Sequence, residues 1–369
     1  MHYYIISGEP SGDLYGSKLI KSLQNIDTNA QFTCWGGSHM QNAGGDIVIS
    51  LESLSYMGFY EVVKNSLLIL KNLMFAKKHI KKINPHAIIL IDYPGFNLKI
   101  AEYANKMNIP VFWFVAPQVW AWRKSRVKQM KKYIDKLFVA LPFELDYFKK
   151  EGIDTFYFGH PMIDIIGNIS QKKNNPLLGK PVIALLPGSR IQEVRKLLPV
   201  MLKSSVSFND YRFVVVCVDH IKRSFYEDLI QNYNIELVFN QNILKTAKLA
   251  IVSSGTATLE LAIYNIPQVV CYKLNILSYL IAKFVVRIKH ISLVNILAKQ
   301  PFVDELIQDQ CNVKNLEIAI SKLLDSNNRK KMILNYQHLM KKLGPSDCFL
   351  KTANTIFNHL DGIKKHPNI

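Results

Sequence analysis

The sequence predicts an α/β protein with two doubly wound halves, each a parallel sheet covered by helices on both faces. Apolar runs of strand length recur along the chain, and segments with helical spacing of apolar residues separate them. Runs that are continuously apolar, without alternation, indicate strands buried on both faces. The chain has 369 residues, 49% of them apolar, which is enough for two separate cores.

The first strand is predicted at Tyr3–Ile6, directly before the loop "SGEPSGD" at residues 7–13. Leu14, Leu19 and Leu23 then recur at helical spacing, so the unit is strand, tight loop and helix. Glycines in such a loop let backbone N–H groups approach a ligand, and a helix N-terminus favours phosphate. The loop matches neither the G-x-G-x-x-G pattern nor a P-loop ending in G-K-S/T.

The later predicted strands share the same continuous apolar character. They are "AIILI" (87–91), "VFWFV" (111–115), "KLFVAL" (136–141), "PVIALL" (181–186), "RFVVVC" (212–217), "KLAIVSS" (248–254) and "PQVVCY" (267–272). The polar stretch 170–181 is predicted as a linker between a first domain at 1–169 and a second at 182–345. A C-terminal helix at 346–369 is expected to pack back on the first domain. Ligands of such sheets bind at the carboxyl ends of the strands, so we expect a site in a cleft between the halves.

The charge balance restricts the partners. The chain has 46 basic and 28 acidic residues, a net charge of +18, which favours a polyanion: nucleic acid, an anionic membrane or a phosphorylated substrate. Its five cysteines are far apart and form no C-x-x-C pair, which is typical of reduced cysteines in a cytosolic protein. No window reaches the roughly 18 consecutive apolar residues of a membrane span, and the N-terminus lacks signal-peptide features.

Asp92 is the main catalytic candidate. It follows the predicted strand 87–91 in "DYPGFN", so its carboxylate is expected at the carboxyl end of that strand. A carboxylate there can serve as general base toward a hydroxyl nucleophile. Capping of the following turn or helix is the alternative role of an aspartate at this position.

The segment "APQVWAWRKSRVKQMKK" combines aromatic and basic side chains, including Trp120, Trp122 and Arg126. Such residues stack on sugar rings or bind phosphates, but they are equally typical of an amphipathic helix with a solvated basic face. His160 in "FGHPMID" is a possible acid or ligand, although a single histidine at a domain edge more often has a structural role.

Two glycine-containing loops in the second half each follow a predicted strand. "LPGSR" contains Gly188, Ser189 and Arg190, and "SSGTATLE" contains Gly255 and ends at Glu260. Loops of this kind suit a nucleotide diphosphate, and Glu260 can accept hydrogen bonds from a ribose diol or compensate a helix dipole. The chain contains no D-x-D motif, so we expect no metal and no other cofactor.

Nine motifs along residues 3 to about 310 closely resemble the lipid-A-disaccharide synthase family. They are, in order, "GEPSGD", "MGFYEV", "IDYPGFN", "APQVWAWR", "LPFE", "FGHPMID", "LPGSRIQEV", "SGTATLE" and "ISLVN". The resemblance implies a metal-independent GT-B glycosyltransferase with two Rossmann-like domains, acting on the cytoplasmic face of the inner membrane. It implies transfer from UDP-2,3-diacylglucosamine to 2,3-diacylglucosamine 1-phosphate, with a β-1,6 bond formed and UDP released.

Residue by residue, the resemblance implies that Asp92 is the base that deprotonates the acceptor 6-hydroxyl. The remaining implied substrate-binding residues are Glu9, Ser11, Gly12, Asp13, Asn97, Gly188, Ser189, Arg190, Ser254, Gly255, Thr256, Ala257, Thr258, Glu260 and Asn295. UDP is expected in the second domain and the lipid acceptor against the first. The chain has Gly95 where many relatives have a second acid, and Gln118 where relatives often have a small hydroxyl residue.

Other functions remain open from the sequence. Another GT-B enzyme, such as a UDP-sugar 2-epimerase or a lipid-linked N-acetylglucosaminyl transferase, would share the UDP-binding half. A basic protein that binds RNA or anionic lipid is suggested by charge and aromatic residues alone. With the family resemblance we expect no nucleic-acid partner, and the sequence leaves the oligomeric state open.

The segment 62–82 combines apolar residues with lysines at helical spacing. It is either a core helix or an interfacial helix whose apolar face enters a membrane while its lysines meet anionic headgroups. Leu68, Leu73 and Phe75 are the predicted membrane contacts, with Leu67, Leu70 and Met74 on the same stripe. The segment 277–290 has a similar character and is a second candidate contact.

Overall fold

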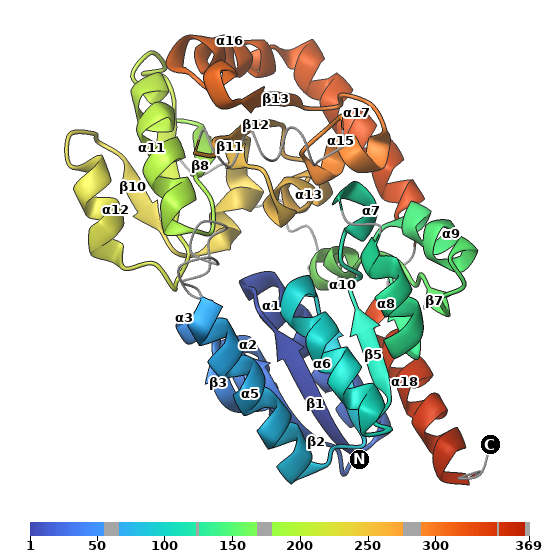
Figure 1. Ribbon diagram of the computed structural model, residues 1–369. Helices are drawn as coiled ribbons and strands as arrows, with labels where there is room; N and C mark the ends of the chain where they lie inside the picture. Colours follow the sequence, from blue (N-terminus) through green and yellow to red (C-terminus); the bar gives the residue numbers. More distant parts are fainter. Residues whose placement is uncertain (55–65, 123–124, 168–178, 276–288, 345–346, 366–369) are drawn as a thin grey trace. The chain divides into compact units, whose positions relative to one another are not determined.

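The computed structural model describes residues 1–54, 66–122, 125–167, 179–275, 289–344 and 347–365 (Figure 1). The chain divides into two compact units. Unit 1 is Met1–Asp164 with Leu343–Ile369, and unit 2 is Ile165–Lys342. Most of the predicted linker, residues 168–178, lies outside the described residues. The C-terminal segment expected at 346–369 belongs to unit 1.

Unit 1 is built on a seven-stranded parallel sheet in the order β3-β2-β1-β4-β5-β6-β7. Its strands are β1 His2–Ser7, β2 Gln31–Gly36, β3 Asp46–Ser50, β4 Ala87–Ile91, β5 Val111–Phe114, β6 Lys136–Phe138 and β7 Thr155–Phe156. Its helices are α1 Pro10–Ile26, α2 Ser38–Asn42, α3 Leu51–Leu54, α5 Ser66–Ile83, α6 Pro94–Lys106, α7 Val119–Trp122, α8 Ser125–Tyr133, α9 Pro142–Lys150 and α18 Cys348–Lys365, with α10 Pro161–Gly167 at the boundary between the units. The register pairs Ser7 of β1 with Ile91 of β4, so the loops after these strands start side by side.

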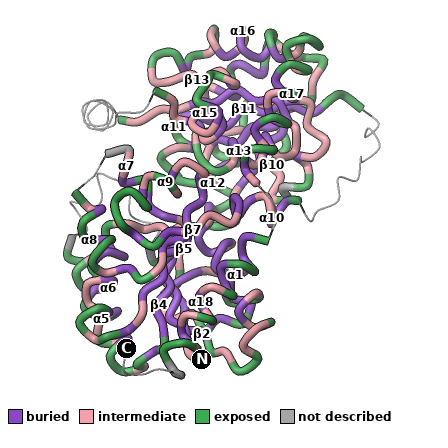
Figure 2. Tube along the Cα trace, turned by 90° about the vertical axis from the view of Figure 1, so that its right-hand side faces the viewer, coloured by how far each residue is buried: buried purple, intermediate pink, exposed green. Residues whose placement is uncertain are grey.

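Helices cover both faces of this sheet, as the predicted fold class requires. α5, α6 and α8 pack on the face that carries alternate strand residues such as Ile6, Leu90 and Trp113. On the other face α1 and α18 lie side by side, and Phe349 of α18 contacts both Tyr15 and Phe114. The C-terminal helix therefore completes the core of unit 1, and the buried segments follow the strands (Figure 2).

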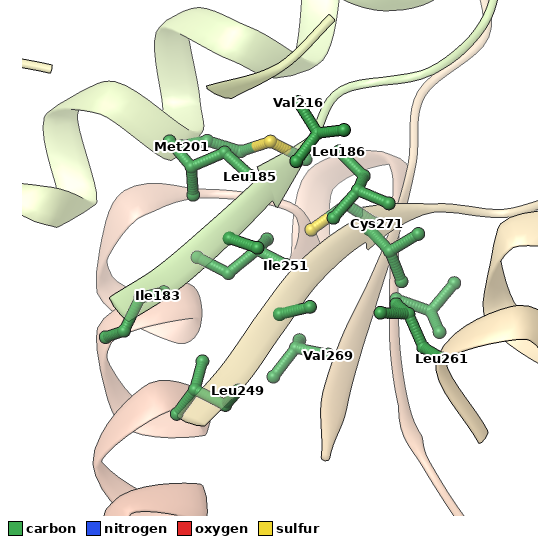
Figure 3. Packing of buried hydrophobic residues seen from close by; sticks show 14 of the residues in the cluster. Ile183, Leu185, Leu186, Met201, Val216, Leu249, Ile251, Leu261, Val269 and Cys271 are labelled. Atoms are coloured by element: carbon green, nitrogen blue, oxygen red, sulfur yellow. The ribbon is translucent and has the colours of Figure 1, made fainter. Parts of the chain in front are cut away.

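Unit 2 repeats the architecture with a six-stranded parallel sheet in the order β10-β9-β8-β11-β12-β13. Its strands are β8 Val182–Leu186, β9 Arg212–Val216, β10 Glu236–Val238, β11 Ala247–Ser253, β12 Gln268–Tyr272 and β13 Asp304–Ile307. Its α-helices are α11 Ile191–Ser205, α12 Arg223–Ile230, α13 Thr256–Ile263, α15 Leu293–Ala298, α16 Val313–Leu324 and α17 Ser326–Lys342. Figure 3 shows Ile183, Leu185, Ile251 and Val269 from adjacent strands packed together in its core.

The predicted fold class of two doubly wound parallel sheets is confirmed. The seven continuously apolar runs all contain observed strands, and "AIILI" has the observed bounds of β4. The sequence did not predict β2, β3, β7, β10 and β13. These strands are short or interspersed with polar residues, as in "QFTCWG" and "DELI", so hydrophobic pattern alone could not distinguish them from loops.

Candidate active site

Asp92 lies at the carboxyl end of β4 in an unusual backbone conformation. Its φ is 47°, and the φ of the next residue, Tyr93, is 49°, so two successive residues are in the left-handed region. Non-glycine residues adopt this conformation at a cost, and such strain is concentrated at functional sites. Val115, a β-branched residue directly after the neighbouring strand β5, also has a positive φ of 63°. The backbone is therefore strained at the carboxyl ends of β4 and β5.

Asn97 holds the strained turn in place. From α6 its Nδ2 donates to the backbone oxygen of Asp92 at 2.7 Å and more weakly to that of Ile91 at 3.4 Å. The Asn97 side chain is fully buried. Asn97 thus orients Asp92 through its backbone, and it takes its place in the site as a positioning residue.

The loop after β1 lies against this turn. A Cβ atom added at Gly8 would come within 2.5 Å of the Tyr93 ring, so only glycine allows the ring to sit there. Burial and, to a smaller extent, the charge of Glu9 raise the pKa of Tyr93 to about 12. The half-buried Glu9 therefore lies near the strained turn that carries Asp92, and Ser11 is half-buried in the first turn of α1.

Gly12 and Asp13 lie deeper in the fold than the sequence suggested. Gly12 is buried within α1, and a Cβ there would collide with the Ser7 hydroxyl, so this glycine lets α1 approach β1 closely. The Asp13 carboxylate is buried and accepts hydrogen bonds from the backbone N–H groups of Gly37, His39 and Met40 at 2.7, 3.1 and 3.1 Å. Its oxygens thus support the start of α2, which is a different task from the contact with sugar or phosphate expected from the sequence.

Glu144 and Trp120 form a pair that the sequence reasoning missed. Glu144, 1% exposed at the start of α9, accepts a hydrogen bond from Trp120 Nε1 at 2.8 Å and one from Leu141 N at 3.0 Å. Burial raises the pKa of Glu144 to about 7, and the charge of Asp92 contributes in the same direction. The available signal was the motif "LPFE", in which a glutamate occupies the first turn of a helix after a strand. Gln118, which stands where relatives often have a small hydroxyl residue, is exposed just before α7.

In unit 2 the loop after β8 is open to solvent. Gly188 has a φ of 122°, and a Cβ there would collide with Glu193 of α11. The Glu193 carboxylate accepts a hydrogen bond from Ser189 N at 3.1 Å and lies 3.8 Å from the Arg190 guanidinium. Ser189 and Arg190 are exposed, so the loop presents a cation beside the N-terminus of a helix.

His220 is a further residue at this loop that the sequence reasoning missed. It follows β9, and its Nε2 lies 2.7 Å from the backbone oxygen of Ser189. Because β8 and β9 are neighbours in the sheet, their following loops meet at one edge. The sequence signal was the polar dipeptide of Asp219 and His220 three to four residues after the end of a buried strand.

The loop "SSGTATLE" after β11 lies at the same edge of the unit 2 sheet. Gly255 and Thr256 are exposed, Ser254 and Ala257 are half-buried, and Thr258 is buried with its hydroxyl donating to the oxygen of Gly255 at 2.8 Å. Thr258 therefore fixes the start of α13, and Gly255 and Thr256 face outward. The half-buried Glu260 follows in α13, and burial raises its pKa to about 7.

Asn295 has an internal role in unit 2. Its amide donates to the oxygen of Val303 at 2.9 Å and accepts from the N–H of the same residue at 3.0 Å. Its Nδ2 also donates to Glu305 Oε1, which accepts in addition from Ser292 N and Oγ. Ser254 Oγ donates to the oxygen of Ile291 at 2.8 Å, so this network joins "ISLVN" to the "SSGTATLE" loop.

The described residues contain neither a metal-binding cluster nor a membrane-spanning helix. No cluster of three or more His, Cys, Asp or Glu residues there has a geometry able to hold a metal ion. None of the helices described has both the length and the apolar character needed to cross a bilayer. His160 is fully buried and accepts a hydrogen bond from Met162 N at 3.1 Å, and burial lowers its pKa to about 3, as suits a structural residue.

The predicted membrane contacts on α5 divide into exposed and buried residues. Leu73 is only 7% exposed and packs in the core of unit 1, so its prediction as a membrane contact is wrong. Leu68 and Phe75 are partly exposed, and Phe75 also stacks on His79. The other apolar side chains exposed on this helix are Leu67, Leu70 and Met74, at 73%, 51% and 56%. The second candidate segment, 277–290, lies almost entirely outside the described residues.

Solved structures share the fold of the whole chain. The S. aureus MnaA–UDP co-structure matches with a TM-score of 0.66 at 14% identity, covering 99% of this chain and 97% of that one. The Neisseria meningitidis UDP-GlcNAc 2-epimerase bound to UDP-GlcNAc matches with a TM-score of 0.61 at 11% identity, with 98% and 100% covered. The spinosyn rhamnosyltransferase SpnG matches with a TM-score of 0.61 at 12% identity, with 97% and 100% covered. At these identities the similarity establishes the fold.

Sequence relatives identify the family. The lipid-A-disaccharide synthetase family model matches residues 3–355. The lipid-A-disaccharide synthase of Coxiella burnetii is 33% identical over 365 residues, 96% of this chain and 97% of that protein. That of Syntrophus aciditrophicus is 35% identical over 355 residues, with 92% and 93% covered.

Two Rossmann-like units give the chain the GT-B fold, and the family that its sequence matches is one of glycosyltransferases. Within that class, the chain belongs to the lipid-A-disaccharide synthetase family. The resemblance seen in the sequence is thereby confirmed, and an enzyme of lipid A biosynthesis is favoured over the epimerase, the lipid-linked transferase and the RNA-binding alternatives.

Proposed function

We propose that this enzyme joins UDP-2,3-diacylglucosamine to 2,3-diacylglucosamine 1-phosphate with inversion at the anomeric carbon. Asp92 takes the proton of the acceptor 6-hydroxyl as its oxygen attacks the donor C1. The bond from C1 to the diphosphate oxygen breaks, and UDP leaves with the electron pair. Attack from the face opposite UDP gives a β-1,6 linkage. A base and an oriented leaving group are sufficient for this step, so no metal or cofactor is required.

The observation that carries the proposal is the strained turn at Asp92 and Tyr93. Positive φ values at two successive non-glycine residues persist only where the surroundings enforce them, and here Asn97 and the Gly8 contact do so. A capping role alone does not explain the positive φ values of this turn, because an N-cap residue normally has extended φ and ψ values. The strained turn thus supports a carboxylate that is positioned for chemistry.

We assign the donor nucleotide to unit 2. The exposed Ser189, Arg190, Gly255 and Thr256 offer a cation, a hydroxyl and backbone donors at the starts of α11 and α13, which suit a diphosphate. Glu260 is placed to accept hydrogen bonds from the ribose diol, which favour its ionised form.

The proposal is tested by incubating the purified protein with both acylated substrates. We expect UDP release only when donor and acceptor are both present, with one disaccharide 1-phosphate formed per UDP. Release of UDP with no acceptor, or conversion of the donor to an epimer, would contradict the proposed transfer.

UDP alone should stabilise the protein, because a ligand that binds only the folded state raises its melting temperature by mass action. We expect Arg190→Ala and Glu260→Gln each to reduce this shift, since the first removes a cation from the diphosphate and the second replaces the charged acceptor of the ribose diol by a neutral amide. Arg212→Ala is a matched control, because Arg212 lies at the opposite end of β9 and pairs with Glu236 at 3.8 Å. Thermal melts with increasing UDP check the prediction, and an undiminished shift in both site variants would place the nucleotide elsewhere.

We further propose that α5 binds the cytoplasmic surface of the inner membrane. Leu67, Leu70 and Met74 expose apolar area on its N-terminal half. The lysines on the same helix are Lys71, Lys77, Lys78, Lys81 and Lys82. An apolar patch beside a cluster of lysines suits an anionic bilayer from which acylated substrates are drawn.

Replacing Leu67, Leu70 and Met74 together by Gln should reduce binding to vesicles that contain phosphatidylglycerol. Each lysine near such a surface contributes about 1 kcal/mol, so we expect the wild-type binding to weaken with salt. Cosedimentation measures both effects. Ile318→Gln with Leu334→Gln removes exposed apolar residues of unit 2 and is the matched control. Equal binding of the triple variant and wild type would exclude α5 as the contact.

A further inference from the structure

The segments that follow three neighbouring strands of unit 1 carry Asp92, Trp120 and Glu144. Asp92 directly follows β4, Trp120 lies in α7 after β5, and Glu144 lies in α9 after β6. The sheet order β4-β5-β6 places the loops after these strands side by side at one edge. Positive φ values at Asp92 and Val115 show that the backbone is strained at two of the three strand ends.

Glu144 is more fully enclosed than a capping residue needs to be. Its Oε2 accepts the Leu141 N–H as in a capping box, but its Oε1 accepts the indole N–H of Trp120 at 2.8 Å, and the whole residue is nearly inaccessible. An exposed capping glutamate would obtain the first bond without losing its hydration. The Trp120 indole itself packs edge-on against Phe143, so both side chains are fixed.

We propose that Glu144 is a positioning residue of the transfer reaction: it fixes the Trp120 indole of α7, and its carboxylate acts electrostatically on Asp92 along the same edge of the sheet. The inference rests on the proposed role of Asp92 as general base. The effect of Glu144 is exerted through Asp92, with no contact to substrate required.

The groups that face Glu144 determine how it titrates. Among the described residues these are Asp92 after β4, Trp120 of α7, the backbone N–H groups of Leu141 and Ala140, and Tyr157 after β7. The Arg126 guanidinium of α8 lies near Gly95: its Nη2 is 3.8 Å from the position that a Cβ of Gly95 would occupy. Burial and the Asp92 charge favour the protonated acid, whereas the Trp120 and backbone N–H donors favour the carboxylate.

The sign of the expected pH effect follows from this balance. The raised pKa of about 7 leaves Glu144 neutral below pH 7 and ionised above it. The ionised form makes Asp92 a stronger proton acceptor, because a neighbouring negative charge favours protonation. We therefore expect kcat to rise as the pH passes through about 7.

Glu144→Gln should remove this rise and lower kcat at pH 8 by about 10-fold, part of the roughly 10² to 10⁴ that a general base contributes. Its KM for the UDP-sugar should stay unchanged, because the donor loops belong to unit 2. Asp27→Asn is a matched control: Asp27 pairs with the N-terminal amine at 2.6 Å and lies at the other end of β1, so its loss should affect stability alone. A Glu144→Gln enzyme with the wild-type pH profile and kcat would overturn the proposal.

Trp120→Phe is the second variant, in case Glu144→Gln does not fold. Losing the indole N–H removes a donor that favours the ionised Glu144, so the midpoint of the pH profile should move upward. An unchanged midpoint would count against the proposal.

A readout without substrates separates the proposal from the proposed function. The protein has four tryptophans, so the indole N–H signals are few, and Trp120→Phe identifies the signal of Trp120 by NMR. We expect this signal to titrate near pH 7 in the wild type, not to titrate in Glu144→Gln, and to titrate at lower pH in Asp92→Asn. An unaltered titration midpoint in Asp92→Asn would refute the electrostatic coupling between Asp92 and Glu144. If the protein shows the expected titrations but transfers no sugar, only the proposed transfer reaction is refuted.

Discussion

Asp92→Asn is expected to fold normally and to lose turnover by roughly 10² to 10⁴, the contribution typical of a general base. Asparagine is the informative substitution, because it tolerates the left-handed conformation that Asp92 adopts at a φ of 47°. The backbone oxygen that accepts from Asn97 is also retained. The variant therefore removes the proton acceptor and leaves the turn in place.

Kinetics at saturating donor and acceptor, with thermal melts of both proteins, check this expectation. The UDP-induced shift of the melting temperature should be the same in Asp92→Asn and wild type, because UDP is assigned to unit 2. Turnover within a few-fold of wild type would leave Asp92 as a capping residue and would require another base.

Asp13→Ala is expected to destabilise unit 1 by about 3 kcal/mol, because loss of a buried acceptor leaves backbone donors unsatisfied at roughly 1 to 3 kcal/mol each. The affected N–H groups are those of Gly37, His39 and Met40, which define the start of α2. Denaturant unfolding of the two proteins measures the difference.

The control for Asp13→Ala is Glu102→Ala, which removes an exposed carboxylate paired with Lys106 within α6. Exposed pairs of this kind contribute little, so its unfolding curve should nearly coincide with that of wild type. If Asp13→Ala is as stable as this control and instead weakens substrate binding, Asp13 contacts substrate as the sequence first suggested.

The layers of the fold were predictable because their signal is local. Strands such as Ala87–Ile91 and Val182–Leu186 are continuously apolar, which indicates burial on both faces of a parallel sheet. Strands such as Asp46–Ser50 and Glu236–Val238 are short and carry polar residues, so only their neighbours in the sheet define them as strands. Pairing across the sheet is not visible in the hydrophobic pattern.

The candidate site was predictable in its residue types but not in their partners. The strand-end position of Asp92 follows from sequence, whereas its left-handed backbone and its contact with Asn97 do not. Asp13 and Asn295 are expected to contact substrate, and the structure shows that each also makes hydrogen bonds within its own unit. Glu144 was overlooked because its link to Trp120 spans 24 residues of sequence.

The same limit explains the correction on α5. The stripe of apolar residues was visible in the sequence. Because the stripe is wide, the sequence could not predict which of its residues pack on the sheet and which are exposed to solvent. The structure places Leu73 in the core and leaves Leu70, three residues before it, and Met74, the next residue, exposed. Exposure, which depends on the helix's rotation against the sheet, thus decides which residues are available to a membrane.

The central claim is an inverting transfer with Asp92 as the base, and the configuration of the new glycosidic bond tests it most directly. The disaccharide 1-phosphate made by the purified enzyme should show a β configuration at the new anomeric carbon in the one-bond C1–H1 coupling measured by NMR. The same product should be nearly absent when Asp92→Asn replaces the wild type. An α linkage, or undiminished β product from Asp92→Asn, would contradict the account.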